Sequence, residues 1–140
     1  MTKKQNDIKI HIIAPNSINI NINSTKFLGL IIDNTLSWKD HIAALTSKLN
    51  KACYAIRVKK PFMSVDVVRM IRFFNVHSVM SHGTIFWGNS RHSNSIFKIE
   101  KRIIRIITNT SSHDSCHQLF KQLQILSLPS QYIFSLLVFF

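Results

Sequence analysis

The sequence predicts a mainly α-helical α+β fold, in which a small antiparallel β-sheet of about three strands precedes a helical bundle. Two observations predict this fold: apolar residues alternate with polar ones near the start of the chain, and after Asn34 they recur at three- and four-residue steps. A chain of 140 residues with 46% hydrophobic residues can bury a core. We expect residues 1–33 to form the β-hairpin segment and residues 34–140 the helical region, truncated where it stops in an apolar run.

The strand pattern has a period of two. Isoleucines alternate with polar residues over 8–12 and again over 18–22, and Ala14–Ser17 between them has the composition of a turn. These features predict an antiparallel hairpin. Lys26–Ile32 follows as a nearly continuous apolar run, which predicts a third strand that is either covered on both faces or paired at the centre of the sheet.

The first predicted helix begins with Ser37 as its cap and Asp40 in a weak capping box, and it stops before Pro61. Its predicted core face carries residues at helical spacing: Trp38, His41, Ile42, Leu45, Leu49, Ala52, Cys53 and Ile56. A second helix is expected from Ser64 to about Gly83, followed by an aromatic loop that contains Phe86 and Trp87.

A third helix is predicted over about Asn94–Thr108, with one cationic and one apolar face. Its cations share an arc of about 100°; they are Lys98, Lys101, Arg102 and Arg105. The opposite side carries Phe97, Ile99, Ile103, Ile104, Ile106 and Ile107. Glu100 projects into the apolar arc, so we expect it to find a basic partner or to reach the edge. Shorter helices are expected over about Asp114–Leu123 and from Ser127 onward.

The charge of the chain indicates its class of partner. It holds 18 Lys plus Arg against 6 Asp plus Glu, a net charge of +12, and both halves are basic. Nucleic acid is the commonest polyanionic partner of such a protein, with a membrane surface as the alternative. Because we find neither a membrane-spanning run nor a signal peptide, we expect an intracellular protein of the nucleus or cytoplasm, with Cys53 and Cys116 as free thiols.

Enzyme signatures are weak. Metal-assisted phosphoryl transfer needs clustered carboxylates, yet no two acidic residues lie closer than seven positions. Three glycines cannot supply a glycine-rich phosphate loop. His113–His117 gathers two histidines and a cysteine, but without a second ligand pair it is better interpreted as a helix start than as a zinc site. We therefore expect no catalytic residue, no metal site and no cofactor.

The cationic arc of the third helix is the strongest candidate site. A basic helix face often serves only to keep a domain soluble. Here few acidic residues are interleaved with the basic ones, which makes phosphate binding an equal alternative.

Several strings, in this order and at these separations, resemble one family. They are Lys26-Phe27-Leu28-Gly29, Asp33, Leu36-Ser37-Trp38-Lys39-Asp40-His41-Ile42, His82-Gly83, Trp87-Gly88-Asn89, and 100–108. Together they resemble reverse transcriptases of jockey-type non-LTR retrotransposons, in the stretch after the catalytic motifs. The resemblance covers about residues 8–140.

The resemblance implies that residues 26–29 are a primer-grip motif at the end of the palm and that the helices form a thumb that holds template-primer duplex. It also implies that the catalytic palm, with its Mg²⁺-binding aspartates, lies upstream of this chain. Two functions follow as hypotheses. One is an inactive polymerase fragment that binds nucleic acid without sequence specificity and has the missing palm as a further expected partner. The other is a protein-interaction or structural module of transposon origin.

Overall fold

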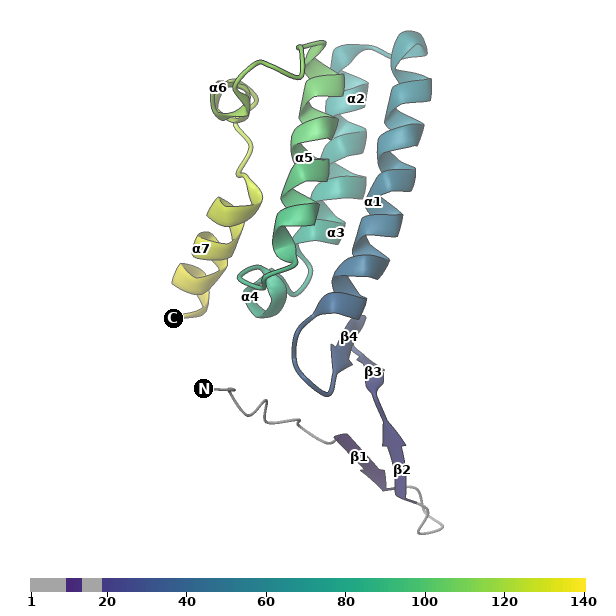
Figure 1. The fold of residues 1–140 in the computed structure, drawn as a ribbon. Helices are drawn as coiled ribbons and strands as arrows, with labels where there is room; N and C mark the ends of the chain where they lie inside the picture. Colours follow the sequence, from purple (N-terminus) through teal and green to yellow (C-terminus); the bar gives the residue numbers. More distant parts are fainter. Residues whose placement is uncertain (1–9, 14–18) are drawn as a thin grey trace.

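A computed structural model describes residues 10–13 and 19–140, and it confirms the predicted mainly α-helical α+β class (Figure 1). Strand β1 (Ile10–Ile13) pairs antiparallel with β2 (Asn19–Ile22), with Ile10 opposite Ile22, as the alternation predicts. Strand β3 (Ser24–Phe27) pairs antiparallel with β4 (Leu30–Asp33), with Ser24 opposite Asp33. The predicted turn at 14–17, and Ile8 and Ile18, lie outside the described residues.

The prediction of one three-stranded sheet with a continuous strand over Lys26–Ile32 is wrong. The described strands form two separate two-stranded sheets, because the chain reverses at Leu28 and Gly29. Both residues have left-handed backbone angles, φ 48° and 82°, as a tight hairpin turn between twisted strands requires. The single glycine in the apolar run therefore marks a turn rather than a strand interior.

The described part of the chain then turns helical. Its elements are α1 (Lys39–Lys59), η1 (Lys60–Phe62), α2 (Val65–Ile71), η2 (Arg72–His77), α3 (Ser78–Ser81), α4 (Thr84–Trp87), α5 (Ser93–Thr108), α6 (Cys116–Gln122) and α7 (Leu128–Phe139). Helix α2, the wide π-helical turn η2 and α3 follow one another as a single rod that runs antiparallel to α1 (Figure 1).

The start of α1 differs from the predicted cap. The residue before the helix is Trp38, in a left-handed conformation and without a side-chain cap hydrogen bond. The carboxylate of Asp33 replaces the cap from outside the helix, since it accepts the backbone N–H groups of Ser37 at 3.3 Å and Trp38 at 3.2 Å. Asp40 is only an exposed acid in the first turn.

The segment around Phe86 and Trp87 is the short helix α4 rather than the predicted aromatic loop. The Trp87 side chain is fully buried, and its Nε1–H donates to the carbonyl oxygen of His82 at 3.1 Å. Phe86 is 61% exposed and stacks on Trp38. The two neighbouring aromatic residues thus face opposite environments.

The main core lies between α1 and α5, which pack on each other more extensively than any other pair of helices described. The predicted core face of α1 is confirmed, since six of its residues are buried: His41, Ile42, Leu45, Leu49, Cys53 and Ile56. Helix α5 buries Ile96, Ile99, Glu100, Ile103, Ile104 and Ile107. Burial of each large aliphatic side chain contributes about 1.5–3 kcal/mol.

Glu100 does not reach the edge of the helix. Its side chain is fully buried, and one of its carboxylate oxygens accepts the backbone N–H of Leu128 at 2.9 Å, where α7 begins. This acid therefore joins α5 to the first turn of α7.

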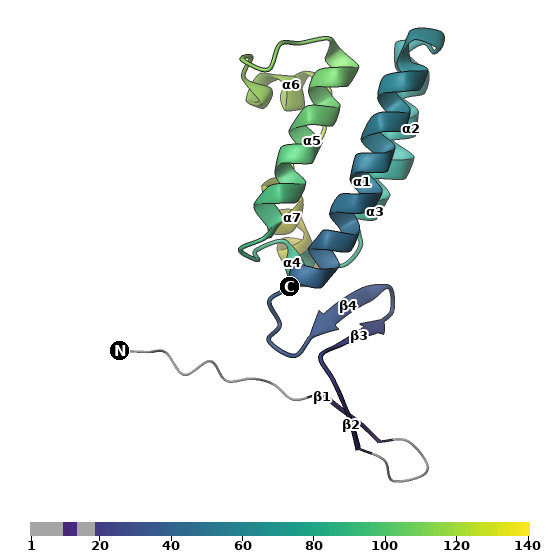
Figure 2. The same cartoon turned by 45° about the vertical axis from the view of Figure 1, so that its right-hand side comes forward.

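Figures 1 and 2 show how these elements are arranged. Helices α1, α2–α3 and α5 stand side by side, and α7 lies on the side of α5 away from α1. The β3–β4 hairpin sits at the N-terminal end of α1, and β1–β2 extends away from the bundle. In the described part of the chain, no helix combines the length and the apolar character needed to cross a membrane.

Candidate nucleic-acid interface

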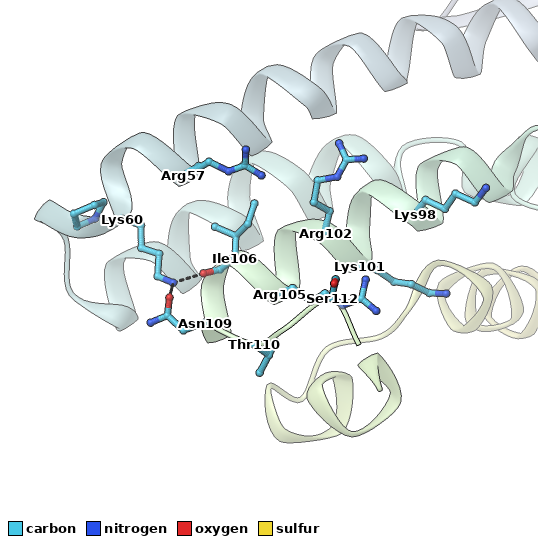
Figure 3. Close-up of a pocket in the computed structure, with 11 residues that line it drawn as sticks. Arg57, Lys60, Lys98, Lys101, Arg102, Arg105, Ile106, Asn109, Thr110 and Ser112 are labelled. Carbon is cyan, nitrogen blue, oxygen red and sulfur yellow. Dashed lines mark hydrogen bonds between the residues drawn. The ribbon is translucent and has the colours of Figure 1, made fainter. Parts of the chain in front are cut away.

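A groove with a volume of about 830 Å³ runs between the C-terminal half of α1 and the outer face of α5 (Figure 3). We call it the basic groove. It is lined by Arg57, Lys60, Pro61, Lys98, Lys101, Arg102, Arg105, Ile106, Asn109, Thr110 and Ser112. Six of these residues are Lys or Arg, and no described residue that lines the groove carries a carboxylate.

The core fixes the orientation of the α5 cations. Ile99, Ile103 and Ile107 are buried against α1 and its neighbours, so the helix cannot rotate without exposing them. Residues at steps of three, four and seven then point to the opposite side. The four predicted cations, Lys98, Lys101, Arg102 and Arg105, consequently line one groove, as their shared arc predicts.

Arg57 and Lys60 complete the basic groove from the end of α1, and neither residue belongs to the site predicted from the sequence. The sequence places both residues off the core stripe of α1. Nothing in the sequence, however, reveals which helix α1 packs against, so the juxtaposition of α1 and α5 could not be derived from spacing. The wall supplied by α1 turns a basic helix face into a hollow.

Contacts within the protein position three of the six cations. Lys60 Nζ donates to the carbonyl oxygen of Ile106 and to Asn109 Oδ1, so it neutralises the C-terminal end of α5 (Figure 3). Lys101 Nζ lies 4.1 Å from the centre of the Phe97 ring. One terminal nitrogen of Arg105 donates to the carbonyl oxygen of Asp114 at 3.3 Å.

The other three cations of the basic groove are Arg57, Lys98 and Arg102. Their side chains are exposed, and within residues 10–13 and 19–140 no hydrogen bond or ion pair engages them. Because exposed cations keep their hydration and rotamer freedom, these three can reach an anionic ligand without breaking an internal contact.

Lys101 and Arg105 also border a second hollow, of about 780 Å³, between α5 and α6. His113, His117 and Lys121 lie in its lining, and so does Asp114. The predicted helix start here is confirmed: α6 begins at Cys116, and the Asp114 carboxylate accepts the backbone N–H of Ser111 at 3.0 Å. No group of three or more metal-binding side chains gathers within the described residues.

The predicted primer-grip residues lie apart from the basic groove. Lys26, Phe27 and Leu28 are exposed at the tip of the β3–β4 hairpin. Gly29 follows them in the turn, and a Cβ atom there would lie 3.0 Å from Nε2 of His82. Lys26 and Gly29 line a different hollow from the α5 cations, so the structure does not bring the two sets together.

Two groups near the start of α1 have shifted pKa values. Burial alone would raise the pKa of Asp33, but hydrogen bonds from Ser37, Thr35 and the backbone of Trp38 stabilise the carboxylate and bring the pKa below its ordinary value. Burial lowers the pKa of His41, and the positive charges of His82 and Lys48 lower it further. Nδ1 of His41 accepts the backbone N–H of Ile31 at 3.3 Å, which requires a ring nitrogen without a proton.

Comparison with known proteins identifies no relative. No protein-family model, no curated protein and no solved structure matches this chain.

Proposed function

We propose that the chain binds double-helical nucleic acid, either an RNA–DNA hybrid or duplex DNA, through the basic groove. The observation that supports this proposal is the collection of six cations from α1, η1 and α5 in one groove whose described lining holds no carboxylate. Phosphates neutralised by these cations would release condensed counterions, which supplies affinity without any base contact. Binding of this kind is independent of sequence.

We further propose that the chain is a fragment of a jockey-type reverse transcriptase, covering the end of the palm and the thumb. The ordered strings of the sequence support this origin. The left-handed turn at Leu28 and Gly29 gives residues 26–29 a compact shape at the tip of a hairpin. The missing palm portion is then a partner of this intracellular fragment, and Mg²⁺ belongs to the complete polymerase only.

This origin also leads us to expect no polymerase activity from the isolated chain. Nucleotide addition needs two metal ions held by palm carboxylates, which the family carries upstream of the part that this chain resembles. Primer extension on a poly(rA)–oligo(dT) template with Mg²⁺ or Mn²⁺ checks the expectation. Extension above that of a boiled sample would contradict it.

The test of the binding function is the salt dependence of affinity for an RNA–DNA hybrid. In the groove variant, Lys98, Lys101, Arg102 and Arg105 are replaced with Gln. The matched control makes the same change in charge at exposed cations that do not line the basic groove: Lys51, Lys59, Arg69 and Arg91. Circular dichroism confirms that both variants keep the helical fold.

We expect the groove variant to bind hybrid more weakly and to lose about 0.9 from the log–log salt slope for each phosphate contact removed. The loss should be similar for duplexes of unrelated sequence. We expect the control variant to keep most of the wild-type slope. Equal slopes for the two folded variants would overturn the proposal.

A second candidate function is a protein-interaction module, and the exposed apolar residues at the end of α7 favour it. Five apolar residues of α7 and the residue that follows it are more than half exposed: Ile133, Phe134, Leu137, Val138, Phe139 and Phe140. Apolar surface of this extent usually marks a contact with another macromolecule. This alternative predicts that the groove variant and the wild type bind the hybrid equally.

A further inference from the structure

A third hollow lies outside the basic groove, between the β3–β4 hairpin, α1 and α3. We call it the hairpin hollow. Its volume is about 460 Å³. Lys26, Lys48 and His82 stand in its lining as exposed side chains, and Ile31, Leu45 and Val79 contribute apolar surface. No described residue that lines it is acidic.

The three basic side chains come from three different elements. Lys26 lies on β3, Lys48 on α1, and His82 follows α3. Nε2 of His82 is 2.9 Å from the carbonyl oxygen of Leu28, so the ring is tied to the hairpin turn. Because a carbonyl oxygen only accepts, Nε2 carries the hydrogen, and Nδ1 is where a second proton would make the ring cationic.

The positive charge around His41, at the border of this hollow, helps to lower its pKa. Its side chain is only 5% exposed, yet the charges of His82 and Lys48 add to burial in lowering its pKa. Nε2 of His41 is buried and has no hydrogen-bond partner within the described residues. The hollow therefore combines basic groups without a neighbouring negative charge in its described lining.

We propose that the hairpin hollow binds a phosphate group through Lys26, Lys48 and His82. Lysine ammonium groups are compact donors suited to phosphate oxygens. The His82 ring adds a third donor when Nδ1 carries a proton, because its Nε2–H already donates to the carbonyl oxygen of Leu28. The hollow is larger than a phosphate, and its apolar lining suits the organic part of a phosphate monoester. This site does not depend on the proposed function of the basic groove, with which it shares no residue.

The experiment titrates the full chain with inorganic phosphate, and separately with adenosine 5′-monophosphate, at constant pH and ionic strength. NMR signals of Gly29 and of the His41 ring report binding. We expect a saturable response in which the pKa of His41 rises, because the bound anion offsets the positive charges of Lys48 and His82. Tighter binding of the nucleotide would identify an organic phosphate as the ligand, and equal binding would identify phosphate alone.

Lys48→Gln and Lys51→Gln form a matched pair of exposed substitutions on α1, and only Lys48 lines the hairpin hollow. We expect Lys48→Gln to weaken phosphate binding by about tenfold or more, and Lys51→Gln to leave it nearly unchanged. The groove variant should keep the wild-type response, which separates this site from the basic groove. A response that does not saturate, or that is the same in the two lysine variants, would overturn the proposal.

Discussion

The core between α1 and α5 and the junction between β4 and α1 hold the chain together in different ways. In the core, four buried isoleucines of α5 share one apolar cluster with the buried residues of α1 and recur at steps of three and four: Ile96, Ile99, Ile103 and Ile107. At the junction, single residues act alone: Gly29 makes the turn, Asp33 holds the start of α1, and His41 bonds to β4. Their contributions rest on individual contacts rather than on a repeated pattern.

The contrast between the two regions shows which features a sequence pattern can predict. A repeated period is redundant, so α5 keeps its orientation even if one residue departs from the pattern, as buried Glu100 does. A single turn or cap has no such redundancy, so the prediction of the local structure fails when the role of one residue is mistaken. We expect substitutions in the two regions to differ in how much they lower the free energy of unfolding and in whether that effect depends on pH.

The largest effect is expected in the core. Ile103 is fully buried, so Ile103→Ala should lower the free energy of unfolding by about 2–5 kcal/mol through lost burial and a residual cavity. Ile106 is only partly buried, and Ile106→Ala should cost clearly less. Urea unfolding followed by circular dichroism measures both. Equal losses of unfolding free energy in the two variants would contradict the orientation of α5 in which Ile103 is fully buried and Ile106 only partly.

A smaller effect is expected at the hairpin turn. Gly29→Val places a branched side chain at φ 82° and a Cβ atom 3.0 Å from the His82 ring, which should cost about 1–3 kcal/mol. Gly29→Asn should cost less, since Asn tolerates left-handed angles better than Val. The same unfolding assay ranks the two variants. If Gly29→Val and Gly29→Asn lowered the free energy of unfolding equally, the left-handed turn at Gly29 would be contradicted.

The free energy of unfolding should depend on the ionisation of Asp33. Because its pKa in the folded state lies below the ordinary value of 3.8, the unfolded chain takes up this proton first as pH falls. The contribution of Asp33 is therefore present above about pH 4 and is lost below it. Asp33→Asn should lower stability at pH 7 by about 1–2 kcal/mol and flatten its dependence on pH between 4 and 2. A variant with the wild-type slope in that range would contradict this role.

His41 should produce the smallest effect, at higher pH. Its folded-state pKa lies below 6.5, so as pH falls below about 6.5 the unfolded chain binds a proton that the folded chain resists, and stability decreases. His41→Asn keeps an acceptor for the Ile31 N–H but does not titrate. Between pH 6.5 and 5 its free energy of unfolding should change less than that of the wild type, by on the order of 1 kcal/mol. If His41→Asn kept the wild-type slope of unfolding free energy against pH in this range, titration of His41 would not contribute to stability.

The sequence predicts the bundle better than the junction because periodicity acts over many residues. The core faces of α1 and α5 and the cationic arc of α5 follow from spacing alone. Asp33 could have been recognised as a cap only with knowledge of the backbone, because it acts from four and five positions before the N–H groups that it accepts. The division of Trp87 and Phe86 between core and surface likewise depends on the short helix α4, which is too brief to show a period.

For the same reason, the sequence predicts only the part of the candidate site that lies on α5. Lys98, Lys101, Arg102 and Arg105 share one face because they share one helix. Arg57 and Lys60 join them only through tertiary packing, which places the end of α1 beside α5. The hairpin hollow could not be predicted, because its basic residues come from three elements that are distant in sequence.

NMR can locate bound duplex on the protein and so test directly whether the basic groove is the nucleic-acid interface. A short RNA–DNA hybrid is added to the ¹⁵N-labelled full chain at moderate salt, and backbone shifts are mapped on the structure. We predict that the largest changes fall in 57–60 and in 98–112, around the basic groove, and that they disappear in the groove variant. Changes centred on α7, or spread evenly over the exposed lysines of the molecule, would contradict the claim that the basic groove is the nucleic-acid interface.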